Sequence, residues 1–547
     1  MKMSKIKRIA AVFLTLAMVM GMSITAFADF AKPVDGDAKV VEVKGIEENV
    51  TYNAYQIIDA EYDASGFTGY VWAPGINEND SIQEGKKVEF SPEGENAVVT
   101  GLDEAFITKL AADPSKLTNC KIGFNPSETP LEAGTWMILV TPTETNPEKV
   151  YNPMIVSVYY SVKGSGDSNE LVSGTIDATK DWELEATDSF AKSSDISLEK
   201  DLDDEPNDTE VAVGDIVPFT ITSTIPSYSP EYYKSPTFQI TDTLVNGLKY
   251  NGEPEVYLGG TEEGNKLSKD VHYTLEYDVN THFTIKFNFN NDTIKNLYSK
   301  TAEARAVTVK YETEILDSAV QKVGENTATL TYSKNTTETG TKTDKEYVFS
   351  FALHNVFQKV DGSNAPLGEA VFTLYKQDAN SEDTIEWAEG EILKVSEVTT
   401  YTTKDAENGD IKFKGLDGDL TYYVKETAAP EGYSINDTIY KVVFTFDKPE
   451  GYTGDDVEYT VTITNNKTDE TKTYTVKYNG TTAESEAGEY GNEPKTGSDE
   501  VTTVINTKLS ALPSTGGIGT TIFTIAGCLI MIAAAGLFFV SRRKSAK

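Results

Sequence analysis

The chain has 547 residues, with 48 basic and 86 acidic side chains and a formal net charge of −38 at pH 7. So acidic a surface repels the phosphates of nucleic acid and excludes a nucleic-acid-binding role. Its three histidines and two cysteines form no nucleophile–base pair or metal-ligand cluster, so the sequence predicts no cofactor or metal and disfavours an enzyme acting on an external substrate.

The first predicted element is an export signal. Four basic residues within the first eight positions precede an apolar stretch at 9–22, and Ala26, Phe27 and Ala28 form a small-x-small cleavage site. This order is typical of a secretory signal peptide, which we place at 1–28. The protein is therefore predicted to be secreted.

The body of the chain has an all-β pattern. Short runs rich in Thr, Val, Tyr, Ile and Phe alternate with Gly, Asn, Asp and Pro clusters, and only 102–113 has a helical pattern. Polar stretches at 192–195, 333–345 and 488–500 are predicted to be linkers. We therefore expect three domains, at 29–191, 192–345 and 346–510. The strand-like runs lie at 135–142, 152–162, 217–225, 282–290, 328–334, 421–427 and 458–466.

In the second predicted domain, polar residues occupy positions where the strand pattern expects core. Side chains alternate between the two faces of a strand, so residues of one parity share a face. By this rule Lys200 lies among leucines in ISLEKDL, Asp242 follows Phe238 and Ile240 in FQITDTL, and Asn326 precedes Ala328 and Leu330 in NTATLTY. Unpaired, each would cost several kcal/mol to bury.

The third predicted domain has the same plan. Lys359 shares parity with Phe357, Glu426 with Tyr422 and Val424, and Asn506 with Val504. Alternatively, such residues lie at sheet edges with their tips in solvent. Two sets in the order lysine, acid and asparagine, with the lysine in an early strand and the asparagine in the last one, favour a shared chemistry instead.

That chemistry is an intramolecular condensation. Burial favours a neutral, nucleophilic lysine amine and a protonated carboxylic acid. The amine attacks the asparagine carbonyl while Asp242 or Glu426 acts as catalytic acid–base, and ammonia leaves. The predicted isopeptide cross-links are Lys200–Asn326 and Lys359–Asn506, and each would join the first and last strands of its domain.

The segment 422–433, YYVKETAAPEGY, resembles the E-box of CnaB-type domains in Gram-positive backbone pilins, with Glu426 at the catalytic position. The preceding domain resembles the fimbrial isopeptide D2 type. The resemblance implies tandem immunoglobulin-like β-sandwiches of the CnaA/CnaB type. The first domain is similar to pilin N-terminal domains only through 54–57 and 131–142, and no third cross-link is predicted there.

The C-terminus has an apolar run at 518–540 that is long enough to span a membrane and is followed by a basic tail. It is preceded by LPSTG: Leu512, Pro513, Ser514, Thr515 and Gly516. This order resembles the LPxTG cell-wall sorting signal, in which a sortase cuts between the Thr and the Gly. The segment 511–547 would then be a sorting tail that holds the chain at the membrane until processing.

Pilin families place the lysine that accepts the cleaved Thr at the junction of the first two domains. The junction WELEATDSFAK, 182–192, ends in Lys192 but differs from the family motif by one extra residue, and Lys163 is the alternative.

The resemblance implies a backbone subunit of a covalent surface pilus, with a role in adhesion. Its implied partners are pilus-type and housekeeping sortases, identical subunits, minor or tip pilins and peptidoglycan. The alternative is a monomeric wall-anchored adhesin or minor pilin. The sequence identifies no host or matrix ligand.

Overall fold

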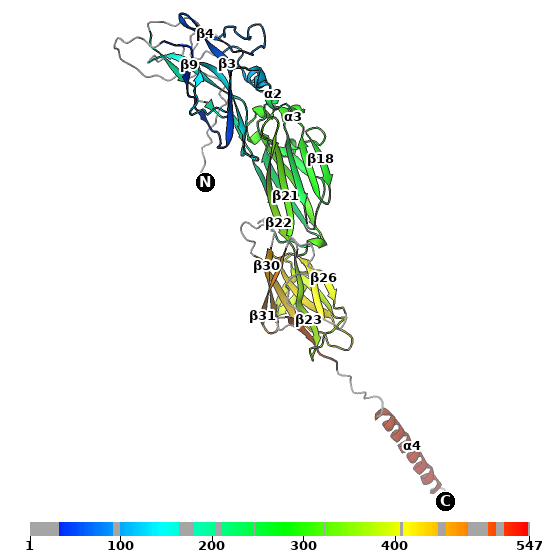
Figure 1. The fold of residues 1–547 in the computed structure, drawn as a ribbon. Helices are drawn as coiled ribbons and strands as arrows, with labels where there is room; N and C mark the ends of the chain where they lie inside the picture. The colour runs from blue at the N-terminus through cyan, green and yellow to red at the C-terminus, as the bar shows by residue number, and fades with distance from the viewer. Residues whose placement is uncertain are drawn as a thin grey trace. The chain divides into compact units, whose positions relative to one another are not determined.

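The computed structural model describes residues 32–90, 99–163, 180–187, 189–202, 209–245, 247–321, 323–404, 409–446, 456–479, 501–509 and 519–544. Strands dominate this part of the chain, which confirms the all-β prediction (Figure 1). It forms two compact units: Met1–Thr209 with Gly214–Ser318 and Gly324–Val348, and Glu210–Val213 with Ala319–Val323 and Phe349–Lys547. The first unit includes the first predicted domain and all of the second except 210–213 and 319–323. The three-domain division stays a prediction.

An antiparallel sheet of six strands forms the centre of the first predicted domain. Five of them follow the order β10-β9-β7-β3-β4, and β5 pairs with β3. The strands are β3 (Val50–Asp63), β4 (Gly66–Trp72), β5 (Cys120–Ile122), β7 (Gly134–Pro142), β9 (Met154–Val162) and β10 (Trp182–Ala186). The core on this sheet contains Trp136, Ile138 and Val158, all fully buried.

Short strand pairs and one helix complete this region. The pairs are β1 (Ala38–Lys39) with β6 (Leu131–Glu132), β2 (Val43–Lys44) with β11 (Ser189–Phe190), and β8 (Lys149–Tyr151) with β12 (Ser193–Asp195). The predicted helix is α1 (Glu104–Ala111), which begins where the Asp103 carboxylate accepts a hydrogen bond from the Phe106 N–H. The β8–β12 pairing includes residues 193–195, so the stretch expected to be a linker there is a strand.

Two sheets form the second predicted domain. The first has the order β13-β14-β20-β16 with β17 on β20, and the second has the order β18-β19-β15-β21-β22. The strands are β13 (Leu198–Leu202), β14 (Ile216–Thr224), β15 (Phe238–Leu244), β16 (Leu248–Tyr250), β17 (Glu255–Leu258), β18 (Tyr273–Asp278), β19 (His282–Phe287), β20 (Ala306–Ile315), β21 (Val323–Ser333) and β22 (Thr339–Phe349). Short helices α2 (Pro230–Tyr233) and α3 (Asp292–Lys295) lie between strands.

The end of the second domain differs from the expectation. Residues 339–345, predicted to be linker, belong to β22, which pairs with β21. Its outward-facing positions are polar threonines and charged residues, which conceal the strand when the sequence is scanned for apolar runs. Asn326 therefore lies in the penultimate strand and not in the last one. A Lys200–Asn326 bond would connect the two sheets, since β13 and β21 belong to different sheets.

The third predicted domain also has two sheets. The smaller has the order β27-β23-β32, with β23 (Phe351–Asp361), β27 (Asp410–Leu416) and β32 (Thr502–Asn506). The larger has the order β25-β26-β24-β28-β29-β30-β31. Its strands are β24 (Val371–Gln377), β25 (Thr384–Ala388), β26 (Glu391–Thr402), β28 (Thr421–Ala428), β29 (Ile439–Thr445), β30 (Asp456–Asn465) and β31 (Thr471–Asn479). The last strand, β32, pairs in parallel with the first, β23.

The chain ends in the helix α4 (Gly519–Lys544). Its segment Ile522–Arg542 has a mean hydropathy of 2.5 and is long and apolar enough to cross a membrane. The predicted signal peptide 1–28, the LPSTG residues 512–516 and the linker 488–500 lie outside the described residues.

Candidate functional site

Two buried lysine–acid–asparagine clusters

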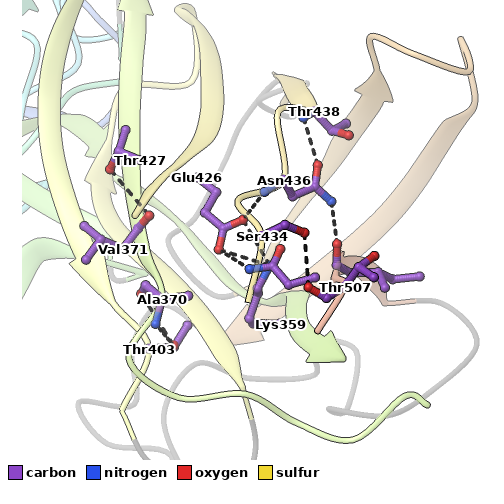
Figure 2. A network of polar contacts seen from close by, with 12 residues as sticks. Lys359, Ala370, Val371, Thr403, Glu426, Thr427, Ser434, Asn436, Thr438 and Thr507 are labelled. Carbon is purple, nitrogen blue, oxygen red and sulfur yellow. Dashed lines mark hydrogen bonds and ion pairs between the residues drawn. The ribbon is translucent and has the colours of Figure 1, made fainter. Parts of the chain in front are cut away.

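Lys359, Glu426 and Asn506 meet inside the third predicted domain. Each is at most 1% exposed. The Lys359 Nζ lies 3.2 Å from the Glu426 carboxylate and also contacts the Asn506 Oδ1, while the Asn506 Nδ2 donates to the Glu426 Oε1 over 2.8 Å. Figure 2 shows Lys359 and Glu426 pointing toward one another. The amine, the acid and the amide are thus in mutual contact.

The parallel pairing of β23 with β32 brings the lysine and the asparagine together. Lys359 lies opposite Val504, and Asp361 lies opposite Asn506. Glu426 comes from β28 in the facing sheet, where its inward parity places it between core residues. The sequence alternation predicts that Lys359, Glu426 and Asn506 face inward, and in the strands all three side chains are buried.

Asn436 supports this cluster and is not identified by the sequence pattern. Its backbone N–H donates to the Glu426 Oε2 over 2.7 Å, and its Nδ2 donates to the Ile505 carbonyl over 2.8 Å (Figure 2). It therefore fixes both the carboxylate and the strand that presents Asn506. In the sequence, Asn436 is marked only as a polar residue shortly after the E-box.

Burial lowers the pKa of Lys359 to about 8, although the Glu426 carboxylate opposes this shift by favouring the charged amine. A sizeable fraction of the amine is therefore neutral near pH 7 to 8, whereas an exposed lysine with a pKa of about 10.4 is almost wholly protonated there. Only a neutral amine has the lone pair required to attack a carbonyl.

The second cluster lies between the two sheets of the second predicted domain. Lys200 from β13 is 2% exposed, and Asp242 from β15 and Asn326 from β21 are fully buried. The Lys200 Nζ lies 2.5 Å from the Asp242 Oδ2. Burial also lowers the pKa of Lys200, and the Asp242 carboxylate opposes the shift.

Two tyrosines complete the second cluster, and the sequence pattern does not identify them. The Tyr311 hydroxyl, from β20, contacts the Lys200 Nζ, donates to the Asp242 Oδ2 over 2.9 Å and accepts from the Asn326 Nδ2 over 3.0 Å. The Tyr250 hydroxyl donates to the Asp242 Oδ1 over 2.8 Å. By its position in the strand, an inward-facing tyrosine cannot be distinguished from an ordinary core residue. The sequence therefore does not indicate that its hydroxyl belongs to the cluster.

The two candidate acceptor lysines

Lys192 is anchored at both its side chain and its backbone. Its Nζ forms an ion pair with Glu104 in the first turn of α1, and its carbonyl accepts from the Asn152 N–H over 2.9 Å. The side chain is 39% exposed. Lys163 has a looser arrangement, with its Nζ 3.8 Å from Asp181 and its side chain 64% exposed. Both amines can be reached from solvent, but Lys192 is the more firmly placed.

Asn152 also contacts the second predicted domain, within the same compact unit. Its Nδ2 donates to the Ser227 carbonyl over 2.6 Å, and its Oδ1 accepts from the Ser229 N–H over 3.2 Å. Through Asn152, the backbone of Lys192 is linked to the loop that precedes α2. Within the described ranges, no group of three or more His, Cys, Asp or Glu side chains is arranged to hold a metal ion.

Comparison with known proteins

Three family models match this chain: a T6 antigen Ig-like domain at residues 35–193, a SpaA prealbumin-like fold domain at 354–448 and an LPXTG cell wall anchor motif at 505–547. The trypsin-resistant surface T6 protein of Streptococcus pyogenes serotype M6 is 23% identical over 589 residues, which cover 97% of this chain and 99% of that protein.

Among solved structures, the T6 backbone pilin of Streptococcus pyogenes serotype M6 matches with a TM-score of 0.52 at 18% identity, covering 88% of this chain and 100% of that chain. The full-length major pilin SpaD of Corynebacterium diphtheriae aligns over 88% of this chain and 96% of that chain, at 16% identity and a TM-score of 0.43. The first of these matches shows a shared fold.

The anchor motif and the apolar helix after it place the protein at the cell surface, attached to the wall. The SpaA-type domain lies in front of that anchor, and homology to the T6 protein runs along almost the whole chain. We conclude that this chain is a wall-anchored surface protein with a SpaA-type domain, homologous to the T6 protein along almost its whole length, and that these relationships support a structural role in a pilus.

Proposed function

We propose that the chain is the backbone subunit of a covalent pilus, in which sortase joins Thr515 of one subunit to Lys192 of the next. The observation that carries the proposal is a firmly placed, half-exposed lysine at 192 in a chain that ends in a sorting signal. The polymer would grow head to tail, since the donor and the acceptor are different sites on each subunit.

The joining reaction is an acyl transfer. Sortase would cleave the Thr515–Gly516 bond and hold the Thr515 carbonyl as an acyl-enzyme. The Lys192 amine would then attack that carbonyl, lose a proton and release the enzyme. The tail from Gly516 onward stays behind in the membrane. If peptidoglycan supplies the amine instead, through a housekeeping sortase, the product is the wall anchor of the fibre. Minor or tip pilins would join through the same chemistry.

Inside each subunit, we propose the isopeptide bonds Lys200–Asn326 and Lys359–Asn506, with Asp242 and Glu426 as the catalytic acids. Direct contact of Lys359 with both Glu426 and Asn506 supports the second bond, and the burial of Lys200 beside Asp242 supports the first. Tension along the fibre would then be carried partly by covalent bonds and not only by sheet hydrogen bonds, each of which contributes about 1 kcal/mol.

The second candidate is a monomeric wall-anchored adhesin or minor pilin. If the chain does polymerise, Lys163, whose side chain is 64% exposed, is the alternative acceptor to Lys192. Tandem mass spectrometry of boiled, SDS-resistant wall extract separates the two candidate functions. A peptide joining Thr515 to Lys192, within a ladder of high-mass species, is expected for the backbone subunit. Thr515 joined only to wall peptide, without a ladder, would refute polymerisation and support the monomeric protein.

A further inference from the structure

The two lysine–acid–asparagine clusters differ in how the acid meets the amide. In the third predicted domain, the Glu426 Oε1 accepts directly from the Asn506 Nδ2 over 2.8 Å. In the second, the Asn326 amide contacts the Tyr311 hydroxyl over 3.0 Å, and Tyr311 in turn donates to the Asp242 Oδ2 over 2.9 Å. A phenolic hydroxyl therefore bridges the acid and the amide in the second domain, whereas the two groups contact each other directly in the third.

Asn326 is also incompletely paired. Its side chain is fully buried, and within the described part of the chain its Oδ1 has no hydrogen-bond partner. A buried polar atom without a partner costs free energy, about 1 to 3 kcal/mol in typical cases. A catalytic role is one explanation for a buried polar atom without a partner. Here the atom belongs to the carbonyl that the Lys200 amine would attack.

We propose that the Tyr311 hydroxyl is a catalytic group of the Lys200–Asn326 condensation and carries a proton from Asp242 to the departing nitrogen of Asn326. The proposal rests on the proposed cross-link in this domain. It assigns the hydroxyl a role in the reaction because Tyr311 contacts the nucleophile, the acid and the amide at once.

The proton balance is complete without any further reactant. Starting from the Lys200 ammonium and the Asp242 carboxylate, the amine gives up two protons in all. The Lys200 Nζ forms a bond to the Asn326 Cγ, and the bond from Cγ to Nδ2 breaks. One proton reaches Nδ2 through the Tyr311 hydroxyl, so that it leaves as ammonia, and the other stays on Asp242.

The surroundings of Tyr311 suit a relay. Its ring stacks on Phe219 at a centroid distance of 5.6 Å, and the Lys200 Nζ lies 5.0 Å from both ring centroids. Burial, with the Asp242 charge as a further cause, raises the pKa of Tyr311 well above its usual value, so the group stays a hydroxyl that can accept one proton while donating another.

The test compares Tyr311→Phe with a matched control, Tyr257→Phe. Tyr257 lies in β17 on the same sheet, is 7% exposed and donates to Glu255, outside the cluster. The full chain is pulse-labelled in cells that lack sortase, and peptide mapping at each chase time measures the fraction of Lys200 joined to Asn326. The Lys359–Asn506 junction in the same molecules is the internal reference.

We expect Tyr311→Phe to slow formation of the Lys200–Asn326 bond by about a hundredfold or more, the lower end of typical acid–base contributions, while Tyr257→Phe and the internal reference keep the wild-type rate. Tyr311→His, which keeps a donor and an acceptor, is expected to link faster than Tyr311→Phe. Circular dichroism of each purified variant checks that it is folded before the linking rates are compared.

Equal linking rates for wild type and Tyr311→Phe would overturn the relay, and so would equal, slow rates for Tyr311→Phe and Tyr311→His. Absence of the Lys200–Asn326 junction from the wild-type chain is a different result, since it would refute the proposed cross-link itself.

Discussion

Replacing Glu426 by glutamine tests the proposed cross-link of the third domain with the least change in shape. Glutamine keeps the size of the side chain and one acceptor oxygen but cannot take up and return protons. That oxygen can accept from the Asn436 N–H, as the Glu426 Oε2 does, whereas the Asn506 Nδ2, which donates to Oε1, would lose its acceptor. We therefore expect a folded domain in which Lys359 and Asn506 stay unlinked.

The size of the effect follows from the loop that the bond would close. Lys359 and Asn506 are 147 residues apart. For a cross-link of that span, the loop-closure relation used for disulfides gives about 5 kcal/mol of unfolded-state entropy at 25 °C. For a domain of this size, each kcal/mol shifts the unfolding midpoint by about 2 to 4 °C, so the midpoint should fall by about 10 to 20 °C.

Intact-mass spectrometry and calorimetry of the same preparation provide the assay. The Glu426→Gln chain should be heavier than expected for the linked form by one ammonia molecule, and only the transition of the third domain should move. Asp437→Asn is the matched control, because Asp437 lies in the same domain, is 81% exposed and pairs with Lys467 at the surface. A variant that still loses both ammonia molecules, or an unlinked one with an unchanged midpoint, would refute the reasoning.

Three further predictions concern the lysines. Lys192→Arg should abolish the high-mass ladder on wall-extract gels while Lys163→Arg leaves it intact, and the opposite pattern would reassign the acceptor. Glu104→Gln removes the ion-pair partner of Lys192 and should reduce the yield of Thr515–Lys192 peptides severalfold, with an unaltered melting curve; a normal yield would show that the pair is not required. Asn506→Ala cannot form the cross-link, so its Lys359 should have a pKa of about 8 in the folded state and about 10.5 in the unfolded state. The free energy of unfolding of this variant should therefore rise by about 3 kcal/mol between pH 8 and pH 10.5. In the linked wild type Lys359 is part of an amide, which does not titrate, so this rise should be missing. Parallel pH dependence of the two proteins in urea titrations would contradict this.

The sequence predicts the strands of this protein well because their faces alternate regularly. Leu198, Lys200 and Leu202 are buried while Glu199 and Asp201 between them are exposed, as parity requires. The same rule places the polar members of both clusters in the core. It fails for β22, where threonines and charged residues cover the outward face and only pairing with β21 shows that the segment is a strand.

Contacts that depend on tertiary arrangement could not be predicted. Glu104 is 88 residues from Lys192, and no periodicity connects a helix start with the segment between β11 and β12 at that distance. Tyr311 has the pattern of an ordinary core aromatic, and only the packing of β20 against the facing sheet directs its hydroxyl to Asp242. Asn436 holds the carboxylate through its backbone N–H, which any residue except proline would supply.

The parallel pairing of β32 with β23 determines when, during export, the cross-link of the third domain could form. An exported chain emerges with its N-terminus first, so Lys359 reaches the outside long before the residues that complete its cluster. The final strand of the domain carries Asn506, and the amide bond would therefore form only after the whole domain has been delivered and folded. Asn326 emerges earlier, so the Lys200–Asn326 bond of the second domain would form first. Because an amide bond is not readily reversed, a linked subunit would be one whose domains had folded completely before sortase joined it to the pilus.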